Sequence, residues 1–223
     1  MTPQSPEEKG FGQGDPALAR WAEQVFQPED EVLREIRERS IREGLPAIAV
    51  GRFDGLHLEV IARAAGALKA VEIGTLGGYS GVCLLRGMGA HGVLHTFEYA
   101  EKHARVAGES FHKAGFGARA HIHVGKALEK LAEVEAEAPF DLVFIDADKV
   151  SYPAYLAWAA DHLREGGVLL ADNAFGFGEI HLPGGDEGRK ALQQFNRELA
   201  QGGRFRATMI PTAEGLAMGV RIR

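Results

Sequence analysis

What the chain lacks narrows its class before any motif is considered. Cys83 is the only cysteine among 223 residues, so an intrachain disulfide is impossible and a cytoplasmic location is the default expectation. No apolar run approaches the ~20 residues needed to span a bilayer. The first residues also lack the basic and then apolar pattern of a signal peptide. We therefore expect no membrane association, and we expect Cys83 to be a buried structural thiol.

The charge balance shows no excess of basic residues. Lys and Arg number 25 against 31 Asp and Glu, a formal net charge of −6 that gives no general attraction for nucleic acid or anionic lipid. The length and the hydrophobic fraction of 45% suit one globular α/β domain. Several arginines do gather in Arg34–Arg42, but glutamates are interleaved with them. That pattern is more typical of a solvated helix face than of an interaction patch.

The chain divides into a tail, a helical extension and a core. Residues 1–14 are polar and rich in Gly and Pro, which predicts a disordered tail. Residues 15–223 are expected to form a single domain. Its first part, 15–45, shows helical periodicity, with a second helix opening at Pro28. The remainder, 46–223, is the predicted α/β core.

Apolar strands alternate with helices from residue 69 onward. The predicted strands cover residues 69–74, 93–98, 120–124, 140–146, 167–172, 204–210 and 216–222. Helices are predicted at 79–88, 100–114, from 127, at 151–163 and at 186–201. Repeated βα units followed by a terminal hairpin predict a doubly wound, largely parallel sheet with helices on both faces.

The first predicted strand runs into the turn Glu72-Ile-Gly74-Thr-Leu-Gly-Gly-Tyr-Ser80. Ligands of open α/β sheets bind at the carboxyl ends of the strands, where glycines allow close approach and a helix presents free N–H groups. Glu98 ends the second strand and is placed to accept hydrogen bonds from ribose hydroxyls. The turn is not G-x-G-x-x-G, and Glu72 suits a cationic ligand better than a pyrophosphate. These residues favour an adenosine-containing ligand over the alternative of mere turn glycines and an exposed acid.

A second polar set follows the fourth and fifth strands. Asp146-Ala-Asp148-Lys149 ends one, and Asp172-Asn173 ends the other. Adjacent strands would bring Asp146, Asp172 and Asn173 together, and their oxygens are the hard ligands that Mg²⁺, Mn²⁺ or Ca²⁺ prefers. Lys149 would then reach a metal-bound hydroxyl. In the alternative interpretation Asp148 and Asp172 cap helices or turns, and Lys149 is a surface ion-pair partner.

With the ending Ile210-Pro and Glu214-Gly-Leu, these motifs resemble the cation-dependent catechol and caffeoyl-coenzyme A O-methyltransferases. The resemblance runs from about Leu45 to the end of the chain. It implies the class I S-adenosylmethionine (SAM) fold, a Rossmann-like α/β sheet of seven mostly parallel strands with an antiparallel last strand. It also implies a homodimer, and methyl transfer to a catechol-like or other vicinal-hydroxyl aromatic small molecule.

Residue roles follow from the resemblance. Asp146, Asp172 and Asn173 would hold a divalent cation, Mg²⁺ by preference, and Lys149 would act with Asp146 as base or electrostatic guide for the attacking hydroxyl. Glu98 would bind the ribose diol, and Ala127 would lie beside the adenine. The full set of implied cofactor-binding residues is Val50, Glu72, Gly74, Thr75, Ser80, Glu98, Ala127 and Asp148.

Two residues depart from the family pattern. Phe177 stands where plant coenzyme A-ester enzymes carry a substrate-contacting Asn, which weakens that assignment, and Lys126 replaces the small or acidic residue usual beside Ala127. The apolar loop Phe175–Gly185 is expected to lie over the active site. Two other functions stay open: methylation of a hydroxylated tRNA base, favoured by Arg34–Arg42, and a non-catalytic adenosine-binding module.

Overall fold

The computed structural model describes residues 15–222, so the predicted tail 1–14 lies outside the described residues. Seven strands form a sheet in the order β3-β2-β1-β4-β5-β7-β6. Their bounds are β1 Lys69–Ile73, β2 Val93–Glu98, β3 Ala120–Val124, β4 Phe140–Ile145, β5 Leu163–Ala171, β6 Phe205–Ile210 and β7 Leu216–Arg221. β1 to β5 pair in parallel, and β7 lies antiparallel between β5 and β6. The predicted doubly wound sheet with an antiparallel last strand is confirmed.

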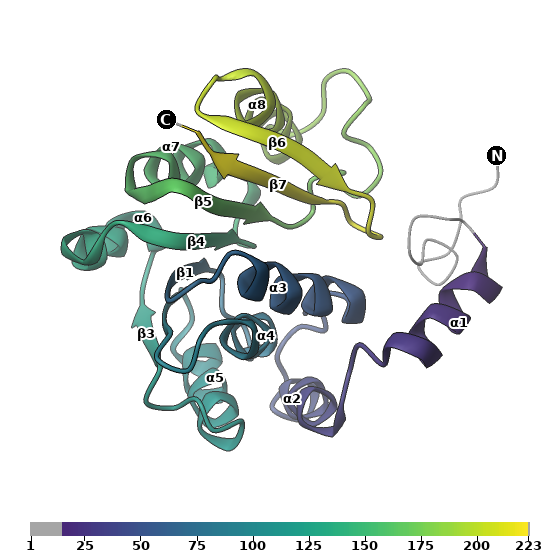
Figure 1. The fold of residues 1–223 in the computed structure, drawn as a ribbon. Helices are drawn as coiled ribbons and strands as arrows, with labels where there is room; N and C mark the ends of the chain where they lie inside the picture. Colours follow the sequence, from purple (N-terminus) through teal and green to yellow (C-terminus); the bar gives the residue numbers. More distant parts are fainter. Residues whose placement is uncertain (1–14, 223) are drawn as a thin grey trace.

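Helices cover both faces of this sheet (Figure 1). One face carries α3 (Arg52–Ala64), α4 (Tyr79–Gly87) and α5 (Glu101–Lys113), and the other carries α6 (Ala127–Lys130), α7 (Tyr152–His162) and α8 (Glu187–Gln201). Short 3₁₀ turns, η2 (Leu131–Glu137) and η3 (Lys149–Ser151), precede β4 and α7. Phe144 of β4 packs into one apolar cluster and Val143 into the other. β4 is therefore buried on both sides, as its nearly all-apolar sequence predicts.

Two helices precede the core. α1 (Pro16–Phe26) projects from the body of the molecule in Figure 1, and α2 (Glu31–Arg42) packs Leu33 and Ile36 into the cluster around α4. α2 begins at Glu31 and not at Pro28, so the predicted start was wrong. The reason is that Asp30 is the N-cap, whose carboxylate accepts a hydrogen bond from the Leu33 amide at 3.0 Å.

The helix α3 has no counterpart in the sequence prediction. Its Gly55 disfavours a helix, yet the close packing of α3 on α4 requires it. A Cβ at Gly55 would lie 3.0 Å from both Tyr79 Cε1 and Cys83 Sγ. Cys83 is buried there, as predicted. Within the described range, no helix is long and apolar enough to cross a membrane.

Candidate functional site

A cavity of about 810 Å³ opens at the carboxyl ends of the parallel strands. The predicted site residues that line it are Val50, Gly74, Thr75, Ser80, Glu98, Ala127, Asp146, Asp148, Lys149 and Asn173. The other two, Glu72 and Asp172, lie behind this lining. The Ser80 hydroxyl donates to Glu72 at 2.6 Å, and the Asn173 amide lies 3.4 Å from Asp172 Oδ2. The fold therefore gathers the predicted catalytic, cofactor-binding and metal-binding residues at one place.

The glycine-rich turn brings β1 close to β4. Gly74 has a φ of +101°, and a Cβ there would lie 2.0 Å from the Asp146 carbonyl oxygen, so the close approach of the two strand ends requires glycine. Glu72 accepts hydrogen bonds from the hydroxyls of Ser80 and Thr96, each at 2.6 Å. Burial nevertheless raises the pKa of Glu72 to about 7. A cationic group in the cavity would favour its charged form.

Glu98 closes β2 with its carboxylate held in place. The Leu76 amide donates to Oε2 at 2.8 Å, and the Ala100 amide donates to Oε1 at 3.0 Å. His103 of α5 also lies at this carboxylate, with Nδ1 3.2 Å from Oε1, and it lines the cavity. His103 was not predicted from the sequence, because nothing in the local pattern distinguishes it from other polar residues of an amphipathic helix.

The polar ends of β4 and β5 lie side by side. Ile145 and Ala171 are paired in register, and the Asp172 amide donates to the Ile145 carbonyl at 3.0 Å. Lys149 Nζ lies 3.0 Å from Asp146 Oδ1 and donates to the Tyr152 hydroxyl at 2.9 Å. Buried Tyr152 donates in turn to the Asp172 carbonyl at 3.1 Å. A short chain of polar contacts thus connects the lysine with both strand ends.

Asp172 lacks a partner for one of its oxygens. Within residues 15–222, Oδ1 of Asp172 is buried without a hydrogen-bond partner, and so is Oδ1 of Asp54 from α3. Burial, with Asp146 and Asp54 nearby, raises the pKa of Asp172 above its usual range. A buried carboxylate oxygen without a donor is costly, and a hard cation would satisfy the one on Asp172. The oxygens present here therefore fit a divalent cation, and Asp54 is a neighbouring carboxylate that sequence reasoning missed.

The residues around the mouth of the cavity differ in what they contact. Asp148 caps η3 by accepting from the Ser151 amide at 3.1 Å, as the alternative interpretation predicts, while it also lines the cavity. Phe177 lines the cavity with 66% of its surface exposed. Phe175 instead packs on the turn at Gly215, where a Cβ would lie 2.6 Å from its ring. The expectation that the apolar loop covers the site therefore fits Phe177 and is wrong for Phe175.

The chain is similar to known O-methyltransferases over most of its length. A family model described as O-methyltransferase matches residues 23–222. The catechol O-methyltransferase of Mycobacterium tuberculosis is 40% identical over 168 residues, which cover 75% of this chain and 76% of that protein. The catechol O-methyltransferase of Niastella koreensis is 37% identical and matches 68% of this chain and 70% of its own length.

Two solved structures share the fold. An O-methyltransferase from Bacillus cereus, in complex with S-adenosylhomocysteine (SAH), superposes with a TM-score of 0.86 at 34% identity and covers 92% of this chain and 97% of its own. An O-methyltransferase from Streptomyces achromogenes, involved in tomaymycin synthesis and in complex with SAM, has a TM-score of 0.88 at 29% identity and covers 99% and 100%. The chain therefore belongs to the O-methyltransferase family and is a SAM-dependent O-methyltransferase with the class I fold.

Proposed function

We propose that this enzyme methylates one hydroxyl of a catechol-like small molecule, with a divalent cation, Mg²⁺ by preference, held by Asp146, Asp172 and Asn173. The observation that carries the proposal is the buried, unpartnered Oδ1 of Asp172 beside Asp146, in the described part of the chain. The names of the M. tuberculosis and N. koreensis relatives support a catechol as acceptor. Membership of an enzyme family argues against a non-catalytic adenosine-binding module.

The cofactor would lie along the first two strand ends. Glu72, Gly74, Thr75 and Ser80 would surround its methionine part, where the Glu72 carboxylate offers a partner for a cationic group. Glu98 is pre-oriented by two backbone amides and keeps lone pairs free for a ribose diol. Beyond these, Ala127 would lie beside the adenine, Val50 would close the cavity from the N-terminal side, and Asp148 would face the cofactor from η3.

The acceptor would lie between the ends of β4 and β5. When bound, a divalent cation there supplies Lewis-acid chemistry that orients a vicinal diol and lowers the pKa of its hydroxyl. Lys149, held by Asp146 and Tyr152, would in its neutral amine form take the hydroxyl proton as the oxygen attacks the methyl group. The residues around the cavity would hold donor and acceptor in line, which lowers the activation free energy by several kcal/mol. The products are the methyl ether and S-adenosylhomocysteine.

The proposal is tested by incubating the enzyme with SAM, Mg²⁺ and a panel of aromatic alcohols. Mass spectrometry should reveal a gain of one methyl group on vicinal diols and none on matched compounds with a single hydroxyl. Equal methylation of both classes would contradict a chelated diol.

The arginines that favoured a tRNA substrate are mostly engaged within the protein. Arg37 pairs with Glu29, Arg39 is buried, and Arg42 pairs with Glu35 at 2.7 Å. Few guanidinium groups of α2 are therefore left for phosphates, which favours the small-molecule acceptor. A salt-sensitive gel shift with bulk tRNA would support the other interpretation.

Replacing Glu98 should weaken the binding of the cofactor. Charge-assisted hydrogen bonds to a ribose diol are worth roughly 1.5–3 kcal/mol each, so Glu98→Ala should raise the Kd for SAM at least tenfold. The exposed neighbour Glu101, in the first turn of α5, supplies a control, since Glu101→Ala should bind normally. Unchanged calorimetric affinity in Glu98→Ala would remove the ribose assignment.

Replacing Phe177 should weaken the binding of the acceptor and leave the affinity for the cofactor unchanged. It lies on the loop that follows Asn173 and forms part of the cavity lining. Phe177→Ala removes the whole ring and should raise the acceptor KM by roughly fivefold to thirtyfold, the range expected for about 1–2 kcal/mol of apolar contact. Leu182→Ala, on the same loop, should leave acceptor KM unaltered. Wild-type acceptor kinetics in Phe177→Ala would mean that the loop is only a connector.

We also propose a homodimer in which α1 meets a second copy. α1 exposes Trp21, Val25 and Phe26 by 56%, 53% and 57%, an apolar face that favours a partner surface. Light scattering should give twice the chain mass for the full-length protein, and a monomer mass would contradict this assembly.

A further inference from the structure

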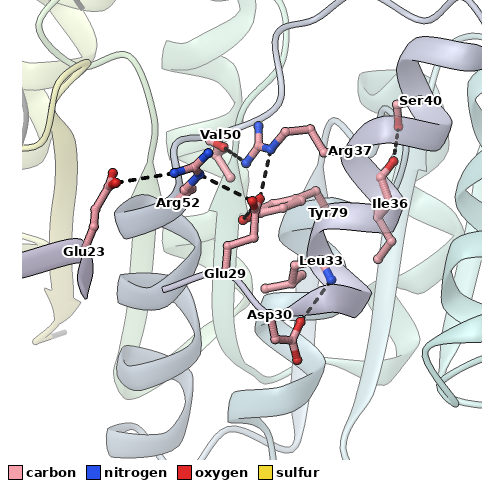
Figure 2. A network of polar contacts seen from close by, with 10 residues as sticks. All are labelled: Glu23, Glu29, Asp30, Leu33, Ile36, Arg37, Ser40, Val50, Arg52 and Tyr79. Atoms are coloured by element: carbon pink, nitrogen blue, oxygen red, sulfur yellow. Dashed lines mark hydrogen bonds and ion pairs between the residues drawn. The ribbon is translucent and has the colours of Figure 1, made fainter. Parts of the chain in front are cut away.

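The segment that links α1 to α2 contains a carboxylate with three basic or hydroxyl partners. Glu29 accepts from Arg37 Nε at 3.0 Å and from the Tyr79 hydroxyl at 3.1 Å, and its Oε2 lies 3.3 Å from Arg52 Nε (Figure 2). The Glu29 side chain is 7% exposed. These partners belong to α2, α3 and α4, so one buried carboxylate joins three helices. We call Glu29, Arg37, Arg52 and Tyr79 the Glu29 cluster.

Two contacts of this cluster reach the wall of the cofactor cavity. Arg37 Nη2 donates to the Val50 carbonyl at 3.2 Å, and its guanidinium carbon lies 4.4 Å from the centroid of the Tyr79 ring (Figure 2). Val50 and Tyr79 both line the cavity, whereas Glu29 and Arg37 stand behind it. Arg37 therefore joins two cavity-lining residues, one before α3 and one at the first position of α4.

Tyr79 is held on its other side as well. A Cβ at Gly55 of α3 would lie 3.0 Å from Tyr79 Cε1, so the ring is packed closely against that helix. Burial raises the pKa of Tyr79 above its usual range, which keeps the phenol protonated and able to donate to Glu29. A charged carboxylate, a guanidinium fork and a cation–π contact together form a stiff arrangement. A side chain fixed in this way before binding loses little entropy when a ligand arrives.

We propose that Arg37 and Glu29 are positioning residues for SAM. They fix the Val50 backbone and the Tyr79 ring. In this way they hold the cavity wall that is formed by residues 46–51 and the start of α4. Neither residue lines the cavity, and their effect on binding passes through Val50 and Tyr79. The inference depends on the SAM dependence of the family and is independent of the acceptor and of the metal.

The experiment measures SAM and SAH binding by calorimetry in full-length protein. Arg37→Met removes the carbonyl contact and the stacking, while Glu29→Gln keeps the shape and removes the charge. Loss of charge-assisted contacts that hold the wall should raise both Kd values by about tenfold. Arg42→Met is the matched control on the same helix, because Arg42 is 58% exposed and pairs with surface glutamates. It should bind both ligands as the wild type does.

Two further readouts separate positioning from general stability. With catechol as acceptor and saturating SAM, the kcat of the variants should stay within about twofold of the wild type. The KM for SAM should rise with the Kd, because the lost affinity is the same in the ground state and in the transition state. Hydrogen–deuterium exchange should rise at residues 46–51 in the ligand-free variants and stay unchanged in Arg42→Met.

Arg37→Lys keeps the positive charge but loses the planar guanidinium group. Its affinity for SAM should lie between those of the wild type and Arg37→Met. Because Arg37→Lys and Glu29→Gln are milder changes, they decide the question if Arg37→Met does not fold. Wild-type Kd values in the variants that fold would overturn the proposal, and so would an equal loss of affinity in Arg42→Met. Failure of catechol methylation alone would leave the calorimetric result intact, so the two proposals fail separately.

Discussion

Removal of divalent cations is expected to abolish turnover, and Asp172→Ala should do the same irreversibly. A metal that polarises the attacking oxygen stabilises the transition state by several kcal/mol. Its removal should therefore slow the reaction by about a hundredfold or more. EDTA-treated wild type should recover when Mg²⁺ or Mn²⁺ is added back, whereas Asp172→Ala should not. The affinity of the variant for SAM should stay within a few-fold, because Asp172 is assigned to the metal and lies outside the cavity lining.

The stability of the same variant provides an internal control. In the described structure Asp172 is 5% exposed and its Oδ1 lacks a partner, so the metal-free fold bears an uncompensated polar group. Asp172→Ala should therefore melt no lower than the metal-free wild type, and a loss of activity would not reflect misfolding. Asp161→Ala removes an exposed carboxylate that pairs with Arg204, and it should keep full activity. Full turnover of a catechol by metal-stripped wild type would contradict the metal proposal.

The parts of this site that could be predicted are those that depend on a short stretch of consecutive residues. The strand Phe140–Ile145 is apolar except for Asp141 because both of its faces are buried, and its end therefore indicates where Asp146 emerges. The glycine turn after β1 is equally local, since Gly74 must pass within reach of the Asp146 carbonyl. Knowing that ligands bind at the carboxyl ends of parallel strands is enough to combine these two segments into a single site.

What escaped the sequence depends on contacts between distant segments. α3 was missed because Gly55 weakens its helical pattern, and the reason for that glycine is the ring of Tyr79 on another helix. Glu29 and Tyr79 are far apart in the chain, and no periodicity relates them. The Phe175–Gly185 loop contains aromatic residues, and their spacing in the sequence does not indicate which of the rings faces the cavity. The backbone path of this loop, with positive φ at Asn173, Gly176 and Phe177, places Phe177 at the cavity and Phe175 against Gly215.

Replacing Lys149 should lower kcat by about 10²–10⁴-fold, the usual contribution of a positioned general base. Lys149 Nζ lies within hydrogen-bonding distance of Asp146 and of the Tyr152 hydroxyl, at the edge of the cavity where the acceptor oxygen would lie. Lys149→Met removes this group and should leave the Kd for SAM within a few-fold. Lys190→Met, an exposed lysine of α8, should behave as the wild type.

Lys149→Arg distinguishes a base from an electrostatic guide. A guanidinium keeps the positive charge but does not give up its proton in proteins, so it cannot accept another. If Lys149 is the base, the arginine variant should be as slow as Lys149→Met. An arginine variant with most of the wild-type rate would contradict the base and favour a charge that only guides the oxygen. The comparison therefore decides which of the two roles the lysine performs.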